Sequence, residues 1–85
     1  NDYIFLDVRT PSEVAAGQIA GSTTIDINSA TFESEISKLD KQKHYAVYCK
    51  SGGRSARAAE FMQSQGFKNV SNMEGGYSAW KKAYE

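Results

Sequence analysis

The sequence predicts an α/β fold: a small parallel β-sheet of four to five strands flanked by helices on both faces. Short runs of β-branched and aromatic residues alternate with segments of helical periodicity along the chain. Several of these runs are almost continuously apolar, as is typical of strands buried on both faces of a parallel sheet. Such alternation predicts parallel strands joined by right-handed crossovers. At 85 residues, the chain (1–85) is expected to form a single domain.

A strand and a short helix are expected at the start of the chain. Residues 3–6 are aliphatic or aromatic, and this run ends at Asp7. The segment 10–13, Thr-Pro-Ser-Glu, carries three signals of a helix start. These are Thr at the N-cap, Pro at the first helical position and Glu positioned to complete a capping box. Gly17 is expected to end this helix.

A second strand and helix follow. Residues 23–27, Thr-Thr-Ile-Asp-Ile, read as a strand. Residues 29–39 are predicted to form a helix, because apolar side chains recur there at spacings of four and three residues. These side chains are Phe32, Ile36 and Leu39. They are expected to face the sheet.

The third strand leads directly into a loop that contains two adjacent glycines. The strand is predicted at residues 45–48, and the loop 49–54 has the sequence Cys-Lys-Ser-Gly-Gly-Arg. A helix is predicted at residues 55–65 and ends at Gly66. The loop therefore lies between the carboxyl end of a strand and the start of a helix.

The last strand and helix are predicted at residues 67–71 and from about 77 to 83, with a glycine-containing turn at 74–76. Three aromatic residues in and just after this helix are spaced to dock one of its sides on the sheet. They are Tyr77, Trp80 and Tyr84.

Composition excludes several classes of function. Ten basic and ten acidic residues give a formal net charge of zero, so no global field favours nucleic acid or an anionic membrane. No apolar run approaches the roughly 20 residues that span a bilayer. One cysteine excludes an internal disulfide and a Cys-rich zinc site. We therefore expect no nucleic acid, membrane or metal partner.

Cys49 occupies the position at which parallel sheets bind ligands, beyond the carboxyl end of a strand. The loop that follows, Lys50, Ser51, Gly52, Gly53 and Arg54, can curl its backbone N–H groups around a centre. Two glycines favour such a ring, because it needs unusual backbone angles and close approach to an anion. A guanidinium at the end of the loop adds a charged fork at the rim. The sequence thus predicts an anion cradle.

The N–H groups of the cradle and the guanidinium at its rim are also expected to lower the pKa of the Cys49 thiol. This nucleophile would then need no histidine base. His44, the only histidine, lies about 16 Å away at the other end of an extended strand, and we expect it at the surface. A ring of amides would also hold a persulfide, which makes covalent sulfur transfer a reasonable mechanism. The alternative is that Cys49 is a small buried hydrophobic residue.

Asp7, Arg9 and Ser55 are candidate supporting residues. Asp7 follows an apolar strand at the same edge of the sheet and is expected to accept hydrogen bonds from a loop backbone. For Arg9 we favour an ion pair with Glu13. Ser55 begins the helix after the cradle.

Other polar and aromatic residues near the loop have simpler interpretations. Lys50 either attracts an anionic donor or is a solvated loop residue. Arg57 is expected to be a surface charge or an ion-pair partner. Tyr48 points to the opposite face from Cys49 and is expected in the core.

Four segments resemble, in order, the motifs of the rhodanese family of sulfurtransferases. Segment 6–13 resembles the opening D-V-R-x-x-x-E motif, and segment 17–22 resembles the G-H-I-x-G-A turn. Segment 47–55 resembles the active-site loop, and segment 72–80 resembles the closing N-x-x-G-G-x-x-A-W motif. The four motifs cover nearly the whole chain and are specific in combination.

The resemblance implies a rhodanese-like fold and a sulfurtransferase with a cysteine persulfide intermediate. Cys49 would be the nucleophile and residues 50–54 the cradle. The implied donor is thiosulfate or a related persulfide, the implied acceptor is cyanide or a thiol, and no cofactor is implied. A single thiol leaves no internal resolving cysteine, so an outside acceptor, such as glutathione or a thioredoxin-like protein, must discharge the persulfide.

The sequence departs from the family pattern in two places. Gln18 replaces the usual histidine, which affects any role of that position in substrate contact or in packing under the loop. The chain begins at the D-V-R strand, without the lead-in strand of many members. We therefore expect a sheet of four strands where five are common, with one edge less protected.

Two other functions are weighed against sulfur transfer. One is a non-catalytic interaction or sulfur-relay module of a larger protein, for which loss of the cysteine would be the usual sign. The other is a dual-specificity phosphatase, whose H-C-x-x-x-x-x-R loop is one residue longer and sized for phosphate. A free reactive thiol favours the cytoplasm, with a periplasmic or exported protein after removal of a leader as the alternative.

Overall fold

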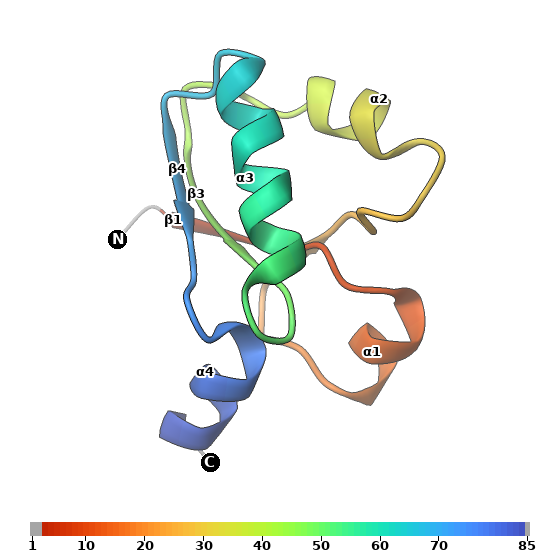
Figure 1. Cartoon of the computed structure of the whole chain (residues 1–85), viewed down its shortest axis with the longest axis vertical. Helices are drawn as coiled ribbons and strands as arrows, with labels where there is room; N and C mark the ends of the chain where they lie inside the picture. Colours follow the sequence, from red (N-terminus) through yellow and green to blue (C-terminus); the bar gives the residue numbers. More distant parts are fainter. Residues whose placement is uncertain (1–2, 85) are drawn as a thin grey trace.

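The computed structural model describes residues 3–84 and shows four parallel strands in one sheet with helices around it (Figure 1). The strands are β1 (Tyr3–Asp7), β2 (Thr23–Thr24), β3 (His44–Tyr48) and β4 (Asn69–Asn72). Their order in the sheet is β2-β1-β3-β4, so the two longest strands lie at the centre. The predicted fold class is confirmed. Residues 1, 2 and 85, which the single-domain expectation includes, lie outside the described residues.

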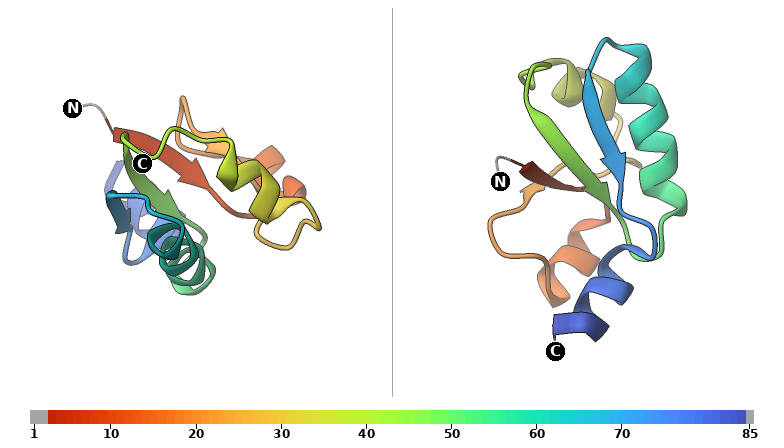
Figure 2. Two further views of the ribbon diagram at one scale, coloured as in Figure 1. Left: turned by 90° about the horizontal axis from the view of Figure 1, so that it is seen from above. Right: turned by 90° about the vertical axis from the view of Figure 1, so that its left-hand side faces the viewer.

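The core lies between one face of the sheet and two of the helices. The helices are α1 (Pro11–Ala16), α2 (Phe32–Ser37), α3 (Gly53–Ser64) and α4 (Gly76–Tyr84). Phe32 and Ile36 of α2 are buried as predicted and share a cluster with Met62 of α3 and strand residues that include Leu6 and Val47. Both α2 and α3 lie on this face, and the right-hand view of Figure 2 shows the sheet from the opposite side.

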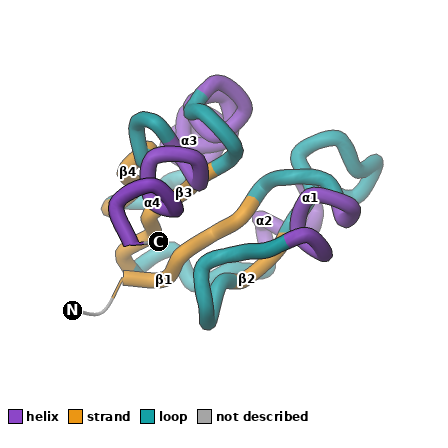
Figure 3. The backbone as a smooth tube through the Cα atoms, turned by 90° about the horizontal axis from the view of Figure 1, so that it is seen from below, coloured by secondary structure: helices purple, strands orange, loops and turns teal. Residues whose placement is uncertain are grey.

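On the opposite face, the carboxyl end of the sheet is covered by α4 and the segment after α1. Tyr48 is fully buried there, as expected for a core residue. Its ring stacks on Tyr77 of α4, and its hydroxyl accepts the N–H of Ile19 at 3.2 Å. Figure 1 shows α1 and α4 beyond the carboxyl ends of β3 and β4, and Figure 3 shows the two helices from below, apart from each other.

The prediction that the aromatic side of the last helix docks on the sheet is wrong for most of its length. Tyr77 stacks on Tyr48, Trp80 stacks on Tyr77, and Tyr84 packs against Trp80 with 74% of its surface exposed. The three aromatic residues therefore form a row that leads outward from the sheet edge. The cause is the start of α4, which is bonded to the loop after β3 and so directs the helix away from the sheet.

Several predicted boundaries differ from the structure. The helix predicted at 55–65 is α3, which begins at Gly53 and so includes the last two residues of the predicted loop, and α2 ends at Ser37 rather than at 39. At three other boundaries, local hydrogen bonds compete with regular structure. Strand β2 stops at Thr24, since the Asp26 carboxylate accepts the N–H of Asn28 and turns the chain. Helix α2 starts only at Phe32, because the Ser29 hydroxyl accepts the N–H of Thr31 in a preceding turn.

Strand β4 starts at Asn69 rather than at residue 67. The N–H of Phe67 bonds to the Met62 carbonyl and closes the end of α3. Within residues 3–84, no helix has both the length and the apolarity needed to cross a membrane.

Candidate active site

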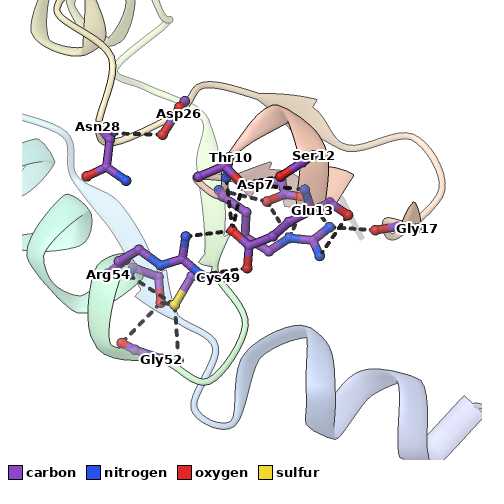
Figure 4. A network of polar contacts seen from close by, with 12 residues as sticks. Asp7, Thr10, Ser12, Glu13, Gly17, Asp26, Asn28, Cys49, Gly52 and Arg54 are labelled. Atoms are coloured by element: carbon purple, nitrogen blue, oxygen red, sulfur yellow. Dashed lines mark hydrogen bonds and ion pairs between the residues drawn. The ribbon is translucent and has the colours of Figure 1, made fainter. Parts of the chain in front are cut away.

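Cys49 directly follows β3, and its side chain is 1% exposed at the centre of the loop that leads into α3. The backbone N–H of Gly52 points at Sγ from 3.1 Å and that of Ser55 from 3.4 Å (Figure 4). Burial raises the pKa of the thiol, but hydrogen bonds from Ser55, Gly52 and Ser51 outweigh it and lower the pKa to about 7. The direction agrees with the expectation from the sequence.

The two glycines of the loop have different functions. Gly52 has φ +117°, a backbone conformation that a residue with a Cβ resists. Gly53 begins α3 without a positive φ, and a Cβ added there would meet nothing within 4 Å. The expectation that both glycines are needed for unusual backbone angles is therefore correct only for Gly52.

The Ser55 hydroxyl, at the start of α3, is the centre of a polar cluster that includes the sulfur. Its Oγ lies 3.4 Å from Cys49 Sγ and donates to Asn72 Oδ1 at the end of β4. Asn72 Nδ2 in turn donates to the Gly52 carbonyl at 3.3 Å. No role for Asn72 was predicted from the sequence. The reasoning that selected Asp7, a polar residue at the carboxyl end of a parallel strand, would have found it.

The start of α4 supports the back of the loop. The N–H of Tyr77 donates to the Cys49 carbonyl at 2.7 Å, and that of Ser78 donates to the Lys50 carbonyl at 3.0 Å. Gly76 has φ +55°, and a Cβ there would clash with the Cys49 carbonyl oxygen and lie 2.8 Å from the Lys50 carbonyl group. The sequence showed a glycine turn here but not its contact with the loop.

Arg54, which the sequence predicts as a charged fork at the rim of the loop, is paired with an acidic residue. Its guanidinium binds Glu13 of α1 with two hydrogen bonds, at 2.7 and 2.9 Å (Figure 4). Glu13 also completes the predicted capping box, accepting the N–H of Thr10 at 3.1 Å. The predicted ion pair between Arg9 and Glu13 is therefore wrong, since Arg54 takes that carboxylate.

The ion pair between Arg54 and Glu13 predicts a specific dependence of stability on pH. The Arg54 hydrogen bonds lower the pKa of Glu13 from 4.5 to about 2. Because the pKa is depressed in the folded state, the stabilisation is complete above about pH 4.5 and is lost as the pH falls through 2. Glu13→Gln should therefore be less stable than the wild type at pH 6, and the difference should shrink towards pH 2.

Urea unfolding of Glu13→Gln at a series of pH values measures this difference. Glu33→Gln, which alters an exposed glutamate of α2, serves as the control and should show a smaller difference. A Glu13→Gln difference that stays constant from pH 6 to pH 2 would contradict the ion pair.

Asp7 and Arg9 form a buried pair with each other. Arg9 donates through Nε at 2.9 Å and Nη2 at 2.6 Å to Asp7, and its backbone N–H also bonds to Asp7 Oδ1. Nη2 also reaches the Gly17 carbonyl, and the guanidinium lies 4.4 Å from the centre of the Tyr77 ring. Asp7 thus accepts a backbone N–H as expected, but from Arg9 and not from the Cys49 loop. The pair ties β1, the end of α1 and α4 together.

The structure places the remaining candidates as follows. His44 is exposed at the amino end of β3, Arg57 is exposed on α3, and Lys50 is exposed in the loop. Gln18 is exposed and accepts a hydrogen bond from the Thr24 hydroxyl at 3.4 Å, whereas its neighbour Ile19 is buried. Among residues 3–84, no cluster of three His, Cys, Asp or Glu side chains could hold a metal ion.

A cleft of about 310 Å³ lies beside the loop, between α1 and α4. Its walls include residues of both helices and of the loop: Glu13, Ala16, Lys50, Tyr77, Ser78 and Lys81. Lys50 connects the cleft to the loop, because it directly follows Cys49. The cleft is therefore a hollow beside the Cys49 loop, lined by Lys50 but not by Cys49 itself.

The model of the Rhodanese-like domain family matches residues 1–83 of the chain. The chain belongs to this family. The solved structure of a rhodanese-related protein from Thermoplasma volcanium superposes on this rhodanese-like domain with a TM-score of 0.87 and 39% identity. The match covers 96% of this chain and 79% of that protein. The resemblance inferred from the four sequence motifs is thereby confirmed.

Several curated relatives of this rhodanese-like domain are named sulfurtransferases. It is 40% identical to the putative sulfurtransferase YtwF of Bacillus subtilis, over 94% of this chain and 75% of that protein. It is 35% identical to the thiosulfate sulfurtransferase GlpE of Pseudomonas entomophila, over 95% of this chain and 72% of that protein. These comparisons support a sulfurtransferase family.

Proposed function

We propose that this rhodanese-like domain is a sulfurtransferase. It moves a sulfane sulfur from thiosulfate or a related persulfide to a thiol or cyanide through a persulfide on Cys49. The observation that carries the proposal is the convergence of the Gly52 and Ser55 N–H groups on one buried sulfur. Such a ring stabilises a sulfur anion without a histidine base.

In the first half-reaction, the Cys49 thiolate attacks the outer sulfur of thiosulfate. A bond forms between the two sulfur atoms, and the bond from the outer sulfur to the sulfite group breaks. Sulfite leaves with the electron pair of that bond, so a thiolate and a thiosulfate dianion become a persulfide anion and a sulfite dianion. With a pKa of about 7, a large fraction of the thiol is ionised at neutral pH.

In the second half-reaction, the acceptor attacks the outer sulfur of the persulfide. Cyanide leaves as thiocyanate, or a thiolate leaves as a new persulfide, and the Cys49 thiolate is restored. Cys49 is the only cysteine of the chain, so an outside molecule must supply this acceptor. The cleft between α1 and α4 offers it a place beside Lys50.

The loop supplies a local positive field for an anionic donor, although the formal net charge of the chain is zero. Its source is the backbone N–H groups, together with the exposed ammonium of Lys50. We assign Lys50 the attraction of the donor. Arg54 instead holds the loop to α1 through Glu13.

Incubation with thiosulfate followed by intact-mass measurement tests the proposal. We expect the native protein to gain the mass of one sulfur atom and to lose it when cyanide is added. Cys49→Ser, matched in size and lacking only the sulfur, should gain nothing. A native protein that gains no sulfur, or an equal gain on Cys49→Ser, would refute the proposal.

The same two proteins separate the alternative functions. A phosphatase would hydrolyse p-nitrophenyl phosphate in a reaction that depends on Cys49. We expect no such turnover, because only four residues separate Cys49 from Arg54 and the guanidinium is bound to Glu13. A non-catalytic interaction module would neither load sulfur nor hydrolyse the phosphate ester.

A further inference from the structure

The side chain of Asn72, at the end of β4, has its orientation set by the loop. The Gly52 carbonyl can only accept a hydrogen bond, so the Asn72 amide must present its NH₂ group there, at 3.3 Å. Its carbonyl oxygen Oδ1 then faces the Ser55 hydroxyl at 2.5 Å. Oδ1 is likewise an acceptor only. The Ser55 hydroxyl proton is therefore the donor in this contact.

A hydroxyl has one proton, and this limits what Ser55 can do for the sulfur. While the proton is directed at Asn72, the Ser55 oxygen can only accept from Cys49, 3.4 Å away, as it does when the sulfur is a thiol. The Gly52 carbonyl oxygen is a further acceptor, 3.2 Å from Ser55 Oγ. To stabilise a thiolate, the proton must leave Asn72 and turn to the sulfur, which as an anion is a stronger acceptor than a neutral carbonyl. We propose that Asn72 is a positioning residue that competes with the Cys49 thiolate for the Ser55 hydroxyl proton.

The effect of this competition is to keep the thiol from becoming too weak a nucleophile. The reactivity of a thiolate falls as its pKa falls, and an attacking thiol is most effective when its pKa is near the ambient pH. The N–H groups of Gly52 and Ser55 already favour the anion. The Ser55 hydroxyl also favours the anion when it donates to the sulfur. By limiting this contribution, Asn72 keeps the pKa of the thiol from falling further.

The arrangement also fits the proposed persulfide. In R–S–S⁻ the charge lies on the outer sulfur, and the inner sulfur is neither protonated nor fully charged. Cys49 Sγ then does not accept a hydrogen bond from the Ser55 hydroxyl, whose proton stays directed at Asn72 Oδ1. The amides of the loop remain available to the outer sulfur.

Removing the Asn72 side chain leaves the rest of the site in place. The Gly52 carbonyl still accepts the N–H of Ala56 at 3.0 Å, which anchors the turn. The charged residues on the surrounding elements are retained as well. They are Asp7 at the end of β1, Arg9 after β1, Glu13 of α1, Lys50 of the loop, Arg54 of α3 and Glu74 before α4.

Alkylation by iodoacetamide, followed as a function of pH, tests the inference. The chain has one thiol, so the rate reports on Cys49 alone. The inference rests on the proposed role of Cys49 as nucleophile. Because alkylation needs no sulfur donor, its outcome is separate from the thiosulfate test. The proteins compared are the native chain, Asn72→Ala, Ser55→Ala and the double variant.

For Asn72→Ala we expect the inflection to move down by about one pH unit, since a freed hydroxyl can donate to the thiolate. The limiting rate at high pH should fall by about threefold, and the rate below pH 6 should rise by about threefold, so that the two profiles cross. Ser55→Ala should move the inflection up. In the Ser55→Ala background, Asn72→Ala should have no further effect.

Two further variants keep the test decisive if Asn72→Ala folds poorly. Asn72→Leu keeps the volume without the acceptor and should give the same downward shift. Asn72→Asp retains the acceptor oxygen and should give no downward shift. A merely structural role for Asn72 would loosen the loop and raise the inflection in both the Ala and Leu variants. That result, or the same downward shift with and without Ser55, would overturn the inference.

Discussion

Replacing Gly76 with alanine is expected to destabilise the domain by about 3 kcal/mol and to abolish most sulfur loading at Cys49. The added Cβ would meet the Cys49 carbonyl oxygen and the Lys50 carbonyl group, which are backbone atoms that cannot rotate away. Overpacking of this kind costs about 1–3 kcal/mol, and the left-handed backbone at φ +55° adds about 1–2. Urea unfolding measures the first effect and intact mass after thiosulfate treatment measures the second.

Gly21→Ala is the matched control for Gly76→Ala. Gly21 also has a positive φ, +83°, but a Cβ there would meet nothing within 4 Å. It should therefore show only the backbone cost of about 1 kcal/mol and retain its capacity to load sulfur. Equal losses in the two variants would mean that the contact between α4 and the loop has no special importance.

Truncation of Asp7 to alanine is expected to destabilise the fold by about 3–5 kcal/mol, because it leaves the Arg9 guanidinium buried without its partner. Asp7 is fully buried and Arg9 is 3% exposed, so water cannot replace the lost carboxylate without opening the structure. Chemical unfolding at pH 7 measures the loss. Arg57→Ala, which removes an exposed guanidinium from α3, should change stability by less than about 0.5 kcal/mol.

A double replacement shows whether the loss comes from the uncompensated charge. Asp7→Leu combined with Arg9→Met removes both charges and keeps apolar volume, so it should be more stable than Asp7→Ala alone. Some loss should remain, because Arg9 also holds the Gly17 carbonyl and stacks on Tyr77. If the double variant is as unstable as Asp7→Ala, the loss of stability comes from lost packing and not from an unpaired charge.

The order and type of the elements could be predicted because apolar periodicity and capping residues are local signals. Thr10 and Glu13 form the expected capping box, and Phe32 and Ile36 are buried on one face of α2. The ends of the elements were less predictable. At Ser29 and Asp26, side chains bond to nearby backbone groups and take residues out of the helix and strand.

The pairing of charged residues could not be predicted from spacing. Arg9 lies four residues before Glu13, which suggested an ion pair along a helix. It precedes the N-cap Thr10, however, and is not on the helix, so the rule for residues four apart does not apply. The partner of Glu13 is Arg54, 41 residues away in sequence. Only the folded arrangement of α1 and α3 brings the two together.

The position of Cys49 could be predicted, and its hydrogen-bond partners only in part. A strand that leads through a glycine loop into a helix predicts the ring of amides, which is a backbone property. The contribution of Asn72 depends on the neighbouring strand β4, whose end lies beside the loop only in the folded sheet. The support from Gly76 likewise depends on how α4 is directed.

The row of aromatic rings on α4 places a natural fluorophore, the indole of Trp80, close to the Cys49 loop. Trp80 is the only tryptophan of the chain, and its ring lies 5.7 Å from that of Tyr77. The backbone N–H of Tyr77 bonds directly to the Cys49 carbonyl. The loop is thus connected to the indole ring through Tyr77, which contacts both. We therefore expect the fluorescence of Trp80 to respond when a change at Cys49 moves the loop.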